Sequence, residues 1–347
     1  MGFSSPPEQS INQINKAGQT LVDRKLSQDV LDKALELANQ WRACHAYPIN
    51  TFRATLGTYI TDFKDPIIAQ RLKRMPTIVD KLRRYPNMKL STMQDIGGLR
   101  AVLSTVSEVH KLANRYKTNK RLTHTLIKEY DYISNPRDED GYRSVHLIYK
   151  YRNKRTPIYN GLRIELQIRT RIQHTWATAV ETMGTLLGQA LKSRKGDQEW
   201  LDFFAIVSSA FAHQENTAPI PRYKGFSYKQ TLQEVVKAEK ILGAIDKMQG
   251  FAVAVDAISK QHKGWSYHLL ILDSIAGKVQ IKSYALVDYP KAIADYNNEE
   301  LNASRGAKIE PVLVSVGPID KLRRAYPNFF LDIGEFVKHV TACINKA

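Results

Sequence analysis

The segment at residues 165–170 restricts the fold of this 347-residue chain more than any other, because its side chains alternate as Glu-Leu-Gln-Ile-Arg-Thr. In a β-strand successive side chains point to opposite faces, so Glu165, Gln167 and Arg169 are expected on one face and the aliphatic side chains on the other. Such a strand belongs to a sheet with one face on the core and one polar face. The polar row either faces solvent or contacts a ligand.

Further β-rich and helical segments surround this strand. Strands are expected at residues 99–103, 122–129, 144–151 and 162–168. Helices are expected at residues 27–41, 49–59, 66–84, 106–116, 173–187 and 199–212. Together they predict an α+β domain over residues 26–215, with a mixed β-sheet flanked by helices. The polar residues 1–25 are expected to form a loosely ordered N-terminus.

A polar stretch with two prolines at residues 216–221 predicts a boundary, because such segments commonly link domains. A second, smaller α/β domain is expected over residues 222–347. Its expected helices and strands lie at residues 228–248, 251–258, 266–273, 279–286, 289–296, 311–316 and 333–344. This part shows no grouping of nucleophile, base and metal ligands, so the chemistry is expected in the first domain.

The positive charge of the chain is concentrated in one stretch. The net charge is +17, and residues 51–200 contribute 28 Lys and Arg against 14 Asp and Glu, a net +14. Residues 201–347 contribute 18 against 15, a net +3. A concentrated positive field attracts polyanions such as nucleotides and nucleic acid, although it is also compatible with a basic surface that has no specific ligand.

Several protein classes are excluded by composition. No apolar run approaches the ~20 residues that cross a bilayer, and the N-terminal residues lack the pattern of a secretory signal. The two cysteines, Cys44 and Cys343, are too few for a disulfide framework or a zinc cluster. A cytoplasmic protein is therefore expected.

The first candidate binding motif is basic and lies inside the helix expected at residues 66–84. Arg71 and Arg74 would be neighbours at positions i and i+3, while Lys73 would point elsewhere. Arginine binds phosphate oxygens in a fork and lysine acts as a compact charge, so the motif is suited to phosphates. A solvated basic helix face is the alternative.

The second candidate is a pair of carboxylates. Asp95 stands just before a Gly-Gly pair that leads into an apolar strand, and Glu165 stands on the polar row described above. Mg²⁺ in nucleotide sites commonly takes one or two carboxylates together with substrate phosphates. Asp95 is then a metal ligand, and Glu165 is a second ligand or a general base. An ordinary turn aspartate is the alternative for Asp95.

The third candidate is a Gly-Tyr-Arg-Ser-Val-His segment at residues 141–146. Tyr142 follows a glycine and can stack on a nucleobase, while Arg143 and His146 can meet phosphate or ribose. A packed tyrosine in a hairpin turn is the alternative.

Four motifs follow one another along the chain: the basic Arg-Leu-Lys-Arg, then Asp-Ile-Gly-Gly, then Gly-Tyr-Arg-Ser-Val-His, then Glu-Leu-Gln-Ile-Arg-Thr. In this order they resemble the motifs of the synthetase domain of the RelA/SpoT family, over about residues 40–200. The resemblance implies a nucleotidyltransferase-like fold and transfer of the β,γ-pyrophosphate of ATP, with Mg²⁺, to a ribose 3′-hydroxyl. In most members of the family the acceptor is GDP or GTP.

The resemblance also implies roles for the motif residues. ATP would be bound by Arg71, Lys73 and Arg74, and the metal by Asp95 and Glu165, which are also the catalytic residues. The acceptor would be bound by Tyr142, Arg143, His146, Gln167 and Arg169.

The loop before Tyr142 departs from the family pattern. It reads Arg-Asp-Glu-Asp-Gly-Tyr at residues 137–142, with one residue more than is common and three acids. Acids beside an anionic guanosine phosphate are unfavourable, which favours another acceptor. The chain resembles a toxic branch of small alarmone synthetases, which implies that the acceptor is the 3′-CCA end of tRNA and that the reaction blocks translation. The bases that would form a tRNA footprint are Arg115, Lys117, Lys120, Arg121, Lys128, Lys150, Arg152, Lys154 and Arg155.

Some toxic members carry a fused antitoxin domain, as in CapRel-type phage-defence proteins, and this chain resembles that arrangement. The resemblance implies autoinhibition by the C-terminal domain until a phage protein, such as a capsid protein, releases it. Tyr326 and Phe329 resemble the aromatic element that closes the ATP site; a buried aromatic turn is the alternative. Two other functions stay open: a (p)ppGpp synthetase with a C-terminal regulatory or oligomerisation domain, and a non-catalytic RNA-binding protein.

Overall fold

The chain forms two units in a computed structural model that describes residues 3–23, 25–186, 198–245, 248, 267–273, 278–304, 309–315 and 333–347. The first unit consists of Met1–Ile133 and Ser144–Arg171, and the second of Ser134–Arg143 and Ile172–Ala347. The division therefore falls at residue 171 rather than in the segment 216–221. The second unit also includes a short piece of the chain that joins two strands of the first.

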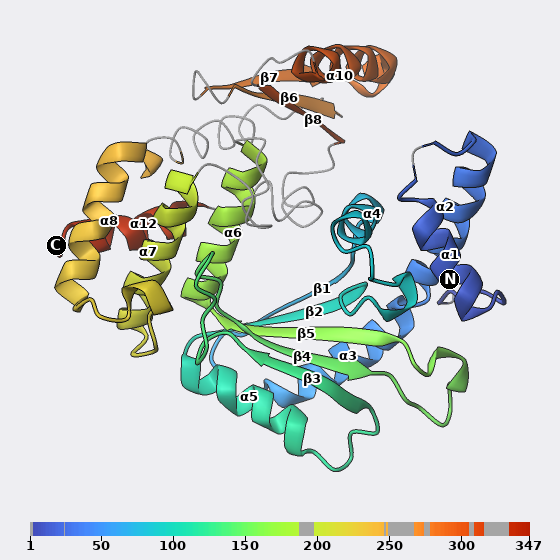
Figure 1. Ribbon diagram of the computed structural model, residues 1–347, viewed down its shortest axis with the longest axis horizontal. Coiled ribbons are helices and arrows are strands. Elements are labelled where there is room, and N and C mark those ends of the chain that lie inside the picture. Colours follow the sequence, from blue (N-terminus) through green and yellow to red (C-terminus); the bar gives the residue numbers. More distant parts are fainter. Residues whose placement is uncertain are drawn as a thin grey trace. The chain divides into compact units, whose positions relative to one another are not determined.

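The centre of the first unit is a five-stranded mixed sheet (Figure 1). Its strands are β1 (Ile67–Leu72), β2 (Gly97–Leu103), β3 (Thr125–Asp131), β4 (Val145–Lys150) and β5 (Arg163–Thr170). They lie in the order β1-β2-β5-β4-β3. The pair β2 and β5 is parallel, and the other neighbouring pairs are antiparallel. The α+β class with a mixed sheet and flanking helices is confirmed.

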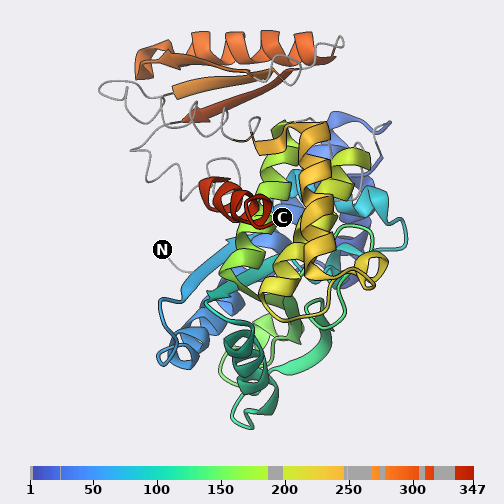
Figure 2. The same cartoon turned by 90° about the vertical axis from the view of Figure 1, so that its left-hand side faces the viewer.

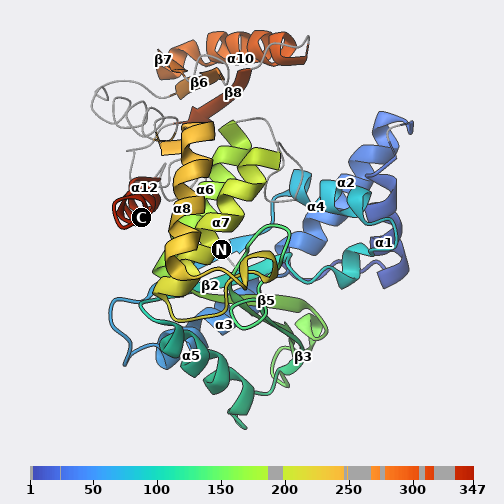
Figure 3. The ribbon, with the colours of Figure 1, turned by 60° about the vertical axis from the view of Figure 1, so that its left-hand side comes forward.

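The two faces of this sheet differ as the alternation on β5 predicts. Ile164, Leu166 and Ile168 are fully buried in the core, where helices pack on one face. Glu165 and Gln167 lie on the other face and are half-buried. The covering helices are α3 (Ala46–Tyr59) and α5 (Val106–Thr118), as Figures 1 and 3 show. The remaining elements of the first unit are α1 (Ile11–Thr20), α2 (Gln28–Ala43), α4 (Met75–Arg84), η1 (Leu90–Thr92) and η2 (Pro157–Tyr159).

The N-terminal segment is more ordered than expected. Ser10 caps α1 through a reciprocal capping box with Gln13, which satisfies backbone N–H groups at the start of the helix. Ile14 and Ala17 are buried, and Ile14 belongs to the main core. The expectation of a loosely ordered N-terminus is therefore wrong for Ile11–Thr20, because burial of this apolar face offsets the entropy of ordering the chain.

The helix expected at residues 66–84 is also wrong in its first half. Residues 67–72 form β1, which pairs with β2 from Ile67 opposite Val102 to Leu72 opposite Gly97. The helix begins only at Met75, with Pro76 in its first turn, where a missing N–H has no consequence. Arg71 therefore lies on a strand and Arg74 is the N-cap of α4, so the two are not helical neighbours.

Gly97 is required by packing between β2 and the core. A Cβ at this position would lie 2.8 Å from Ile164 Cδ1 and 3.1 Å from Ile49 Cγ1. We expect Gly97→Ala to lower the free energy of unfolding by about 1–3 kcal/mol, because the added methyl overpacks the core. Urea unfolding of the full chain measures the change.

The adjacent glycine is a matched control. A Cβ on Gly98 would have Arg71 O as its nearest neighbour, at 3.9 Å. Gly98→Ala should leave the free energy of unfolding within about 0.5 kcal/mol of wild type. Equal stability of the two alanine variants would contradict the assigned packing of Gly97.

Helices build most of the second unit, and Figure 2 shows them side by side. They are α6 (Arg171–Leu186), α7 (Gln198–Gln214), η4 (Pro221–Tyr223), α8 (Tyr228–Leu242) and α12 (Ile333–Ile344). One apolar core joins Phe204 and Phe211 of α7 with Val235 of α8 and Phe336 of α12. The helices on both sides of the segment 216–221 thus share a core, and this segment connects two packed helices. Helix α8 ends earlier than expected, because Gly243 takes the left-handed conformation that terminates helices.

The second unit also contains a small antiparallel sheet. Its strands are β6 (Tyr267–Asp273), β7 (Lys278–Tyr284) and β8 (Ile309–Ser315), in the order β7-β6-β8. The short turn η5 (Leu286–Asp288) precedes α10 (Tyr289–Ser304), which packs on the sheet. These strands and this helix were expected from the sequence. The strand expected at residues 251–258 lies outside the described residues.

None of the helices in the described ranges has the length and apolar character needed to cross a bilayer.

Candidate active site

Polar side chains from three strands meet on the open face of the first unit's sheet. The strand register places Gln167 on β5 opposite both Arg100 on β2 and His146 on β4. It also places Glu165 opposite Gly98, and Gly98 opposite Arg71 on β1. Directly opposed residues project to the same face, so this row brings predicted site residues together.

Glu165 is the centre of a hydrogen-bonded group within this row. His146 Nδ1 lies 3.0 Å from Glu165 Oε1, and Gln167 Nε2 donates to Glu165 Oε2 at 2.8 Å. The side chains of His146 and Glu165 are each only 12% exposed, so the contact is shielded from water. Arg100 completes the row, with its guanidinium 3.4 Å from Gln167 Oε1.

The electrostatics of this group bear on the role of Glu165. Burial alone would raise the pKa of Glu165, but the nearby His146 and the hydrogen bonds from His146 and Gln167 lower it below its ordinary value. A carboxylate with a lowered pKa is a weak proton acceptor at neutral pH. The lowered pKa is more easily reconciled with metal ligation than with general-base catalysis, the two roles that the sequence left open for Glu165.

Two lysines surround Asp95 just before β2. Lys73 Nζ is 2.8 Å from Asp95 Oδ2, and Lys81 Nζ from α4 is 3.0 Å from Oδ1. Burial alone would raise the pKa of Asp95, but the charges of Lys73 and Lys81 outweigh it and lower the pKa to about 2. Lys81 belongs to none of the sequence motifs, because only the fold brings the last turn of α4 to Asp95.

The residues present fit a magnesium ion. Asp95 Oδ1 is buried with the ammonium of Lys81 at 3.0 Å, so this oxygen already faces a positive charge of the kind that a bound cation would supply. Asp95 also lies near enough to Glu165 to influence its pKa. Within the described part of the chain no group of three or more His, Cys, Asp and Glu forms a closed metal cage. Mg²⁺ needs no such cage when phosphates and water supply its remaining ligands.

A cavity of about 610 Å³ borders these charges. Lys81, His146 and Glu165 line it, together with an aromatic pair on β3 and beyond. The rings of Tyr130 and Tyr132 stack at 5.5 Å with 8° between their planes. The volume is in the range of small-ligand sites, and aromatic rings provide stacking surfaces for nucleobases. The alternating Tyr-Asp-Tyr at residues 130–132 is the sequence signal for this pair, because alternate residues of a strand share one face. It was not among the predicted site motifs.

A second cavity of about 590 Å³ is lined by residues 4–9, 39, 40, 42 and 43 and by none of the predicted site residues.

Three predicted residues lie outside the hydrogen-bonded groups just described. Arg71 and Arg74 are exposed, on β1 and at the start of α4. Arg169 is only 2% exposed at the end of β5, so it is buried rather than part of an open polar row. Tyr326 and Phe329 lie outside the described residues.

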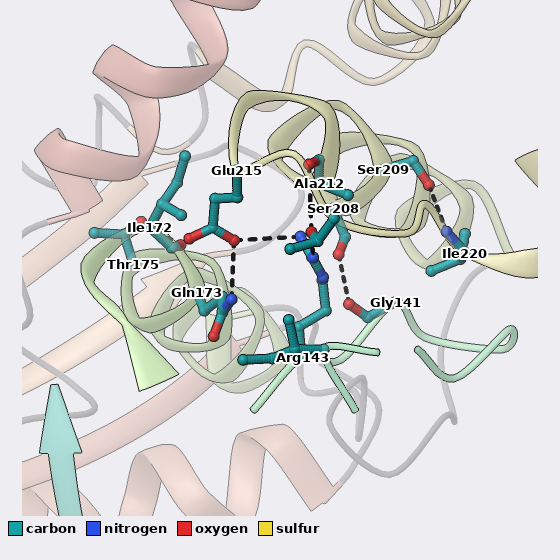
Figure 4. A network of polar contacts seen from close by, with 12 residues as sticks. Gly141, Arg143, Ile172, Gln173, Thr175, Ser208, Ser209, Ala212, Glu215 and Ile220 are labelled. Atoms are coloured by element: carbon teal, nitrogen blue, oxygen red, sulfur yellow. Dashed lines mark hydrogen bonds and ion pairs between the residues drawn. The ribbon is translucent and has the colours of Figure 1, made fainter. Parts of the chain in front are cut away.

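Tyr142 and Arg143 belong to the second unit, in the segment Ser134–Arg143. The guanidinium of Arg137 lies 4.7 Å from the centre of the Tyr142 ring. Arg143 is only 3% exposed; it contacts Thr217 and, as Figure 4 shows, Glu215. The expectation that Arg143 meets substrate phosphate or ribose is therefore at odds with its surroundings, because its charge is already engaged by Glu215 inside the unit.

The acids of this loop are engaged as well. Arg137 contacts Asp140 at 2.6 Å, and Asp138 Oδ1 accepts a hydrogen bond from the backbone N–H of Arg222 at 2.8 Å. An acid that pairs with a base or accepts a hydrogen bond repels a phosphate less than an isolated acid does. The repulsion of a guanosine nucleotide expected from Asp138 and Asp140 is therefore smaller.

The sequence of this region matches a known family. Residues 70–183 match the family model described as the region found in RelA / SpoT proteins. The segment is a RelA/SpoT domain. It includes Arg71, Asp95, Tyr142 and Glu165, so the predicted motifs lie within it.

Two curated relatives match part of this chain. The GTP pyrophosphokinase YjbM of Bacillus subtilis is 33% identical over 113 residues, which are 32% of this chain and 52% of YjbM. The GTP pyrophosphokinase YwaC of the same organism is 32% identical over 114 residues, 31% of this chain and 52% of YwaC. The chain thus spans about half the length of the curated relatives it matches.

Solved structures align with a larger share of this chain, at lower sequence identity. The small alarmone synthetase 1 of Bacillus subtilis aligns with a TM-score of 0.41 and 23% identity, covering 50% of this chain and 88% of that chain. A GTP pyrophosphokinase family protein from Streptococcus pneumoniae aligns with a TM-score of 0.40 and 22% identity, covering 55% and 93%.

Proposed function

We propose that this chain is an ATP-dependent pyrophosphokinase that transfers the β,γ-pyrophosphate of ATP to a ribose 3′-hydroxyl. One observation carries the proposal: within the RelA/SpoT domain, Lys81, His146 and Glu165 line one cavity, and Lys81 pairs with Asp95. A pure polyanion-binding protein gains nothing from carboxylates among its bases, which argues against the non-catalytic alternative.

The proposed roles follow from charge and geometry. Lys73, Lys81 and Arg71 neutralise the phosphates of ATP, and Asp95 and Glu165 hold Mg²⁺, which would add charge neutralisation at the transferring group. Glu165 lies 3.0 Å from His146 Nδ1 and so orients the imidazole at the cavity, and an imidazole in its neutral form can take up a proton. The 3′-hydroxyl proton passes to His146, the 3′-oxygen bonds to the β-phosphorus, and the bond from that phosphorus to the AMP oxygen breaks.

GDP or GTP is one candidate acceptor. Two relatives are named GTP pyrophosphokinases, and the loop acids Asp138 and Asp140 have partners that reduce their repulsion of phosphate. With this acceptor the product is (p)ppGpp, and the C-terminal part has a regulatory or oligomerisation role.

The 3′-CCA end of tRNA is the second candidate acceptor. Arg163 lines the cavity, and the hairpin between β4 and β5 continues from it to exposed Arg152, Lys154 and Arg155. A row of exposed bases leading from a nucleotide cavity is suited to a nucleic-acid backbone. With this acceptor the product is a tRNA that cannot be aminoacylated, and translation stops.

A labelled-transfer assay separates the candidates. Purified protein is incubated with Mg²⁺, γ-labelled ATP and either GDP, GTP or tRNA, with periodate-oxidised tRNA as the control that lacks a reactive 3′-hydroxyl. Label on GDP or GTP alone supports the alarmone synthetase, and label on intact tRNA alone supports the toxin. Transfer to none of the three would refute the pyrophosphokinase.

Autoinhibition is a further part of the proposal, and it derives from the resemblance to CapRel-type proteins. Tyr326 and Phe329 would close the ATP site, and a phage protein such as a capsid protein would release it by binding the open state more tightly. Expression of Tyr326→Ala without infection should arrest growth, whereas Tyr326→Phe, which keeps the ring, should not. Normal growth with Tyr326→Ala would contradict the closure.

A further inference from the structure

The connection between β3 and β4 is held by the helical unit. Ser134–Arg143 carries Tyr142, and by chain order it leaves the first unit's sheet after β3 and returns to it at β4. Its anchors come from the second half of the chain, on α7 and the turns that follow. Ser208 Oγ donates to Gly141 O at 2.5 Å, and the backbone N–H of Arg222 donates to Asp138 at 2.8 Å.

The backbone of this segment packs directly against α7. Gly141 has φ +71°, and a Cβ there would lie 2.9 Å from Ser208 Cβ and 3.2 Å from Ala205 Cα. Such closeness is possible only for glycine. The position of the next residue, Tyr142, is therefore set by contact with the helix rather than by a free loop.

Glu215 anchors the far end of the segment. Its Oε2 lies 3.4 Å from Arg143 Nη1 and accepts a hydrogen bond from Gln173 Nε2 at 2.9 Å (Figure 4). Arg143 also donates to Thr217 Oγ1, and Thr217 is tied to the end of α7 through the carbonyl of Ala212. The side chains of Arg143 and Glu215 are 3% and 11% exposed, so each is the buried counter-charge of the other.

Removal of this negative charge would take away a buried counter-charge of Arg143 and weaken the contact that holds the arginine in place. Because Arg143 directly follows Tyr142, any such movement displaces the tyrosine. Glu215 itself lies outside residues 70–183, the part of the chain that matches the RelA/SpoT region.

We propose that Glu215 is a positioning residue for the acceptor: through its contacts with Arg143 and Gln173 it holds Tyr142 where the acceptor base stacks. This inference rests on the proposed function, in which Tyr142 binds the acceptor.

The test compares Glu215→Gln with Glu234→Gln in the full-length protein. Glutamine keeps the shape of Glu215 and removes its charge, while Glu234 forms an exposed ion pair with Lys237 on α8 and is the matched control. For Glu215→Gln we expect the KM for the acceptor to rise about tenfold and the KM for ATP to stay within about twofold of wild type. The control should change neither constant. Unchanged constants, or an equal rise in both, would overturn the positioning role.

Hydrogen exchange supplies a readout that does not depend on turnover. Backbone amides of residues 134–143 should exchange several-fold faster in Glu215→Gln, while those of β2 and β5 keep the wild-type rate. Equal rates in 134–143 would overturn the inference. A wild-type protein that transfers no label refutes the proposed function instead, and exchange in the variant still decides whether Glu215 holds the segment.

Discussion

Glu165→Gln should reduce pyrophosphate transfer by about a thousandfold or more, because it removes a charge at the point where metal, phosphates and His146 meet. Glutamine can still accept the hydrogen bond that Gln167 donates, so the sheet should remain intact. The change is measured as the initial rate of label transfer at saturating ATP and Mg²⁺.

Glu129→Gln is the control for the loss of one carboxylate in the same sheet. Glu129 lies on β3, is 36% exposed and pairs with Lys117 at 2.9 Å on the surface. Its replacement should change the rate by less than about twofold, since surface pairs contribute little. A Glu165→Gln enzyme with a rate within tenfold of wild type would remove Glu165 from the catalytic group.

Asp95→Asn should produce a second large loss of transfer, of about a thousandfold, for a different reason. The carboxylate both holds Mg²⁺ in the proposed mechanism and separates the charges of Lys73 and Lys81. The variant should therefore need far more Mg²⁺ for half-maximal rate, which a titration at fixed ATP measures. Asp80→Asn, at an exposed ion pair with Arg84 on α4, should titrate like wild type. A normal Mg²⁺ dependence for Asp95→Asn would contradict its assignment as a metal ligand.

The same variant has a predictable effect on stability. The pKa of Asp95 falls from its ordinary value of 3.8 to about 2 in the folded protein. Because the folded pKa is the lower one, the stabilisation is complete above about pH 4 and is lost as the pH falls towards 2. It amounts to about 2 kcal/mol. Urea unfolding should show the largest difference between wild type and Asp95→Asn near neutral pH and a smaller one at about pH 3; a difference independent of pH would contradict the lysine–carboxylate contacts.

The elements of the fold that could be predicted from the sequence are those determined by a pattern within one short segment of the chain. The alternation at residues 165–170 and the short β-rich segments of β2 and β4 are local patterns that predict strands without knowledge of their partners. They predicted three strands of the candidate site. Asp95, His146 and Glu165 were selected because their chemistry and spacing suit a nucleotide site, and the fold gathers them around two charge clusters.

The parts that sequence missed depend on distant partners. Residues 67–72 read as the start of a basic helix, and only pairing with β2 makes them a strand. Lys81 lies on a helix and Glu215 lies in the turn after one, and neither belongs to a sequence motif or a periodic pattern. Arg143 was assigned to substrate because arginine beside a tyrosine suits a nucleotide, whereas its charge is engaged by a residue 72 positions later.

The shared aromatic core of the helical unit has a consequence for how this protein can be divided. Phe336 of the last helix packs at 5.9 Å from the rings of both Phe204 and Phe211. A chain shortened at residue 221 would lose this partner and leave large aromatic rings facing water, which favours aggregation. The segment after residue 221 therefore cannot be removed or replaced independently of α7. A replacement segment would have to supply an aromatic ring at the position of Phe336.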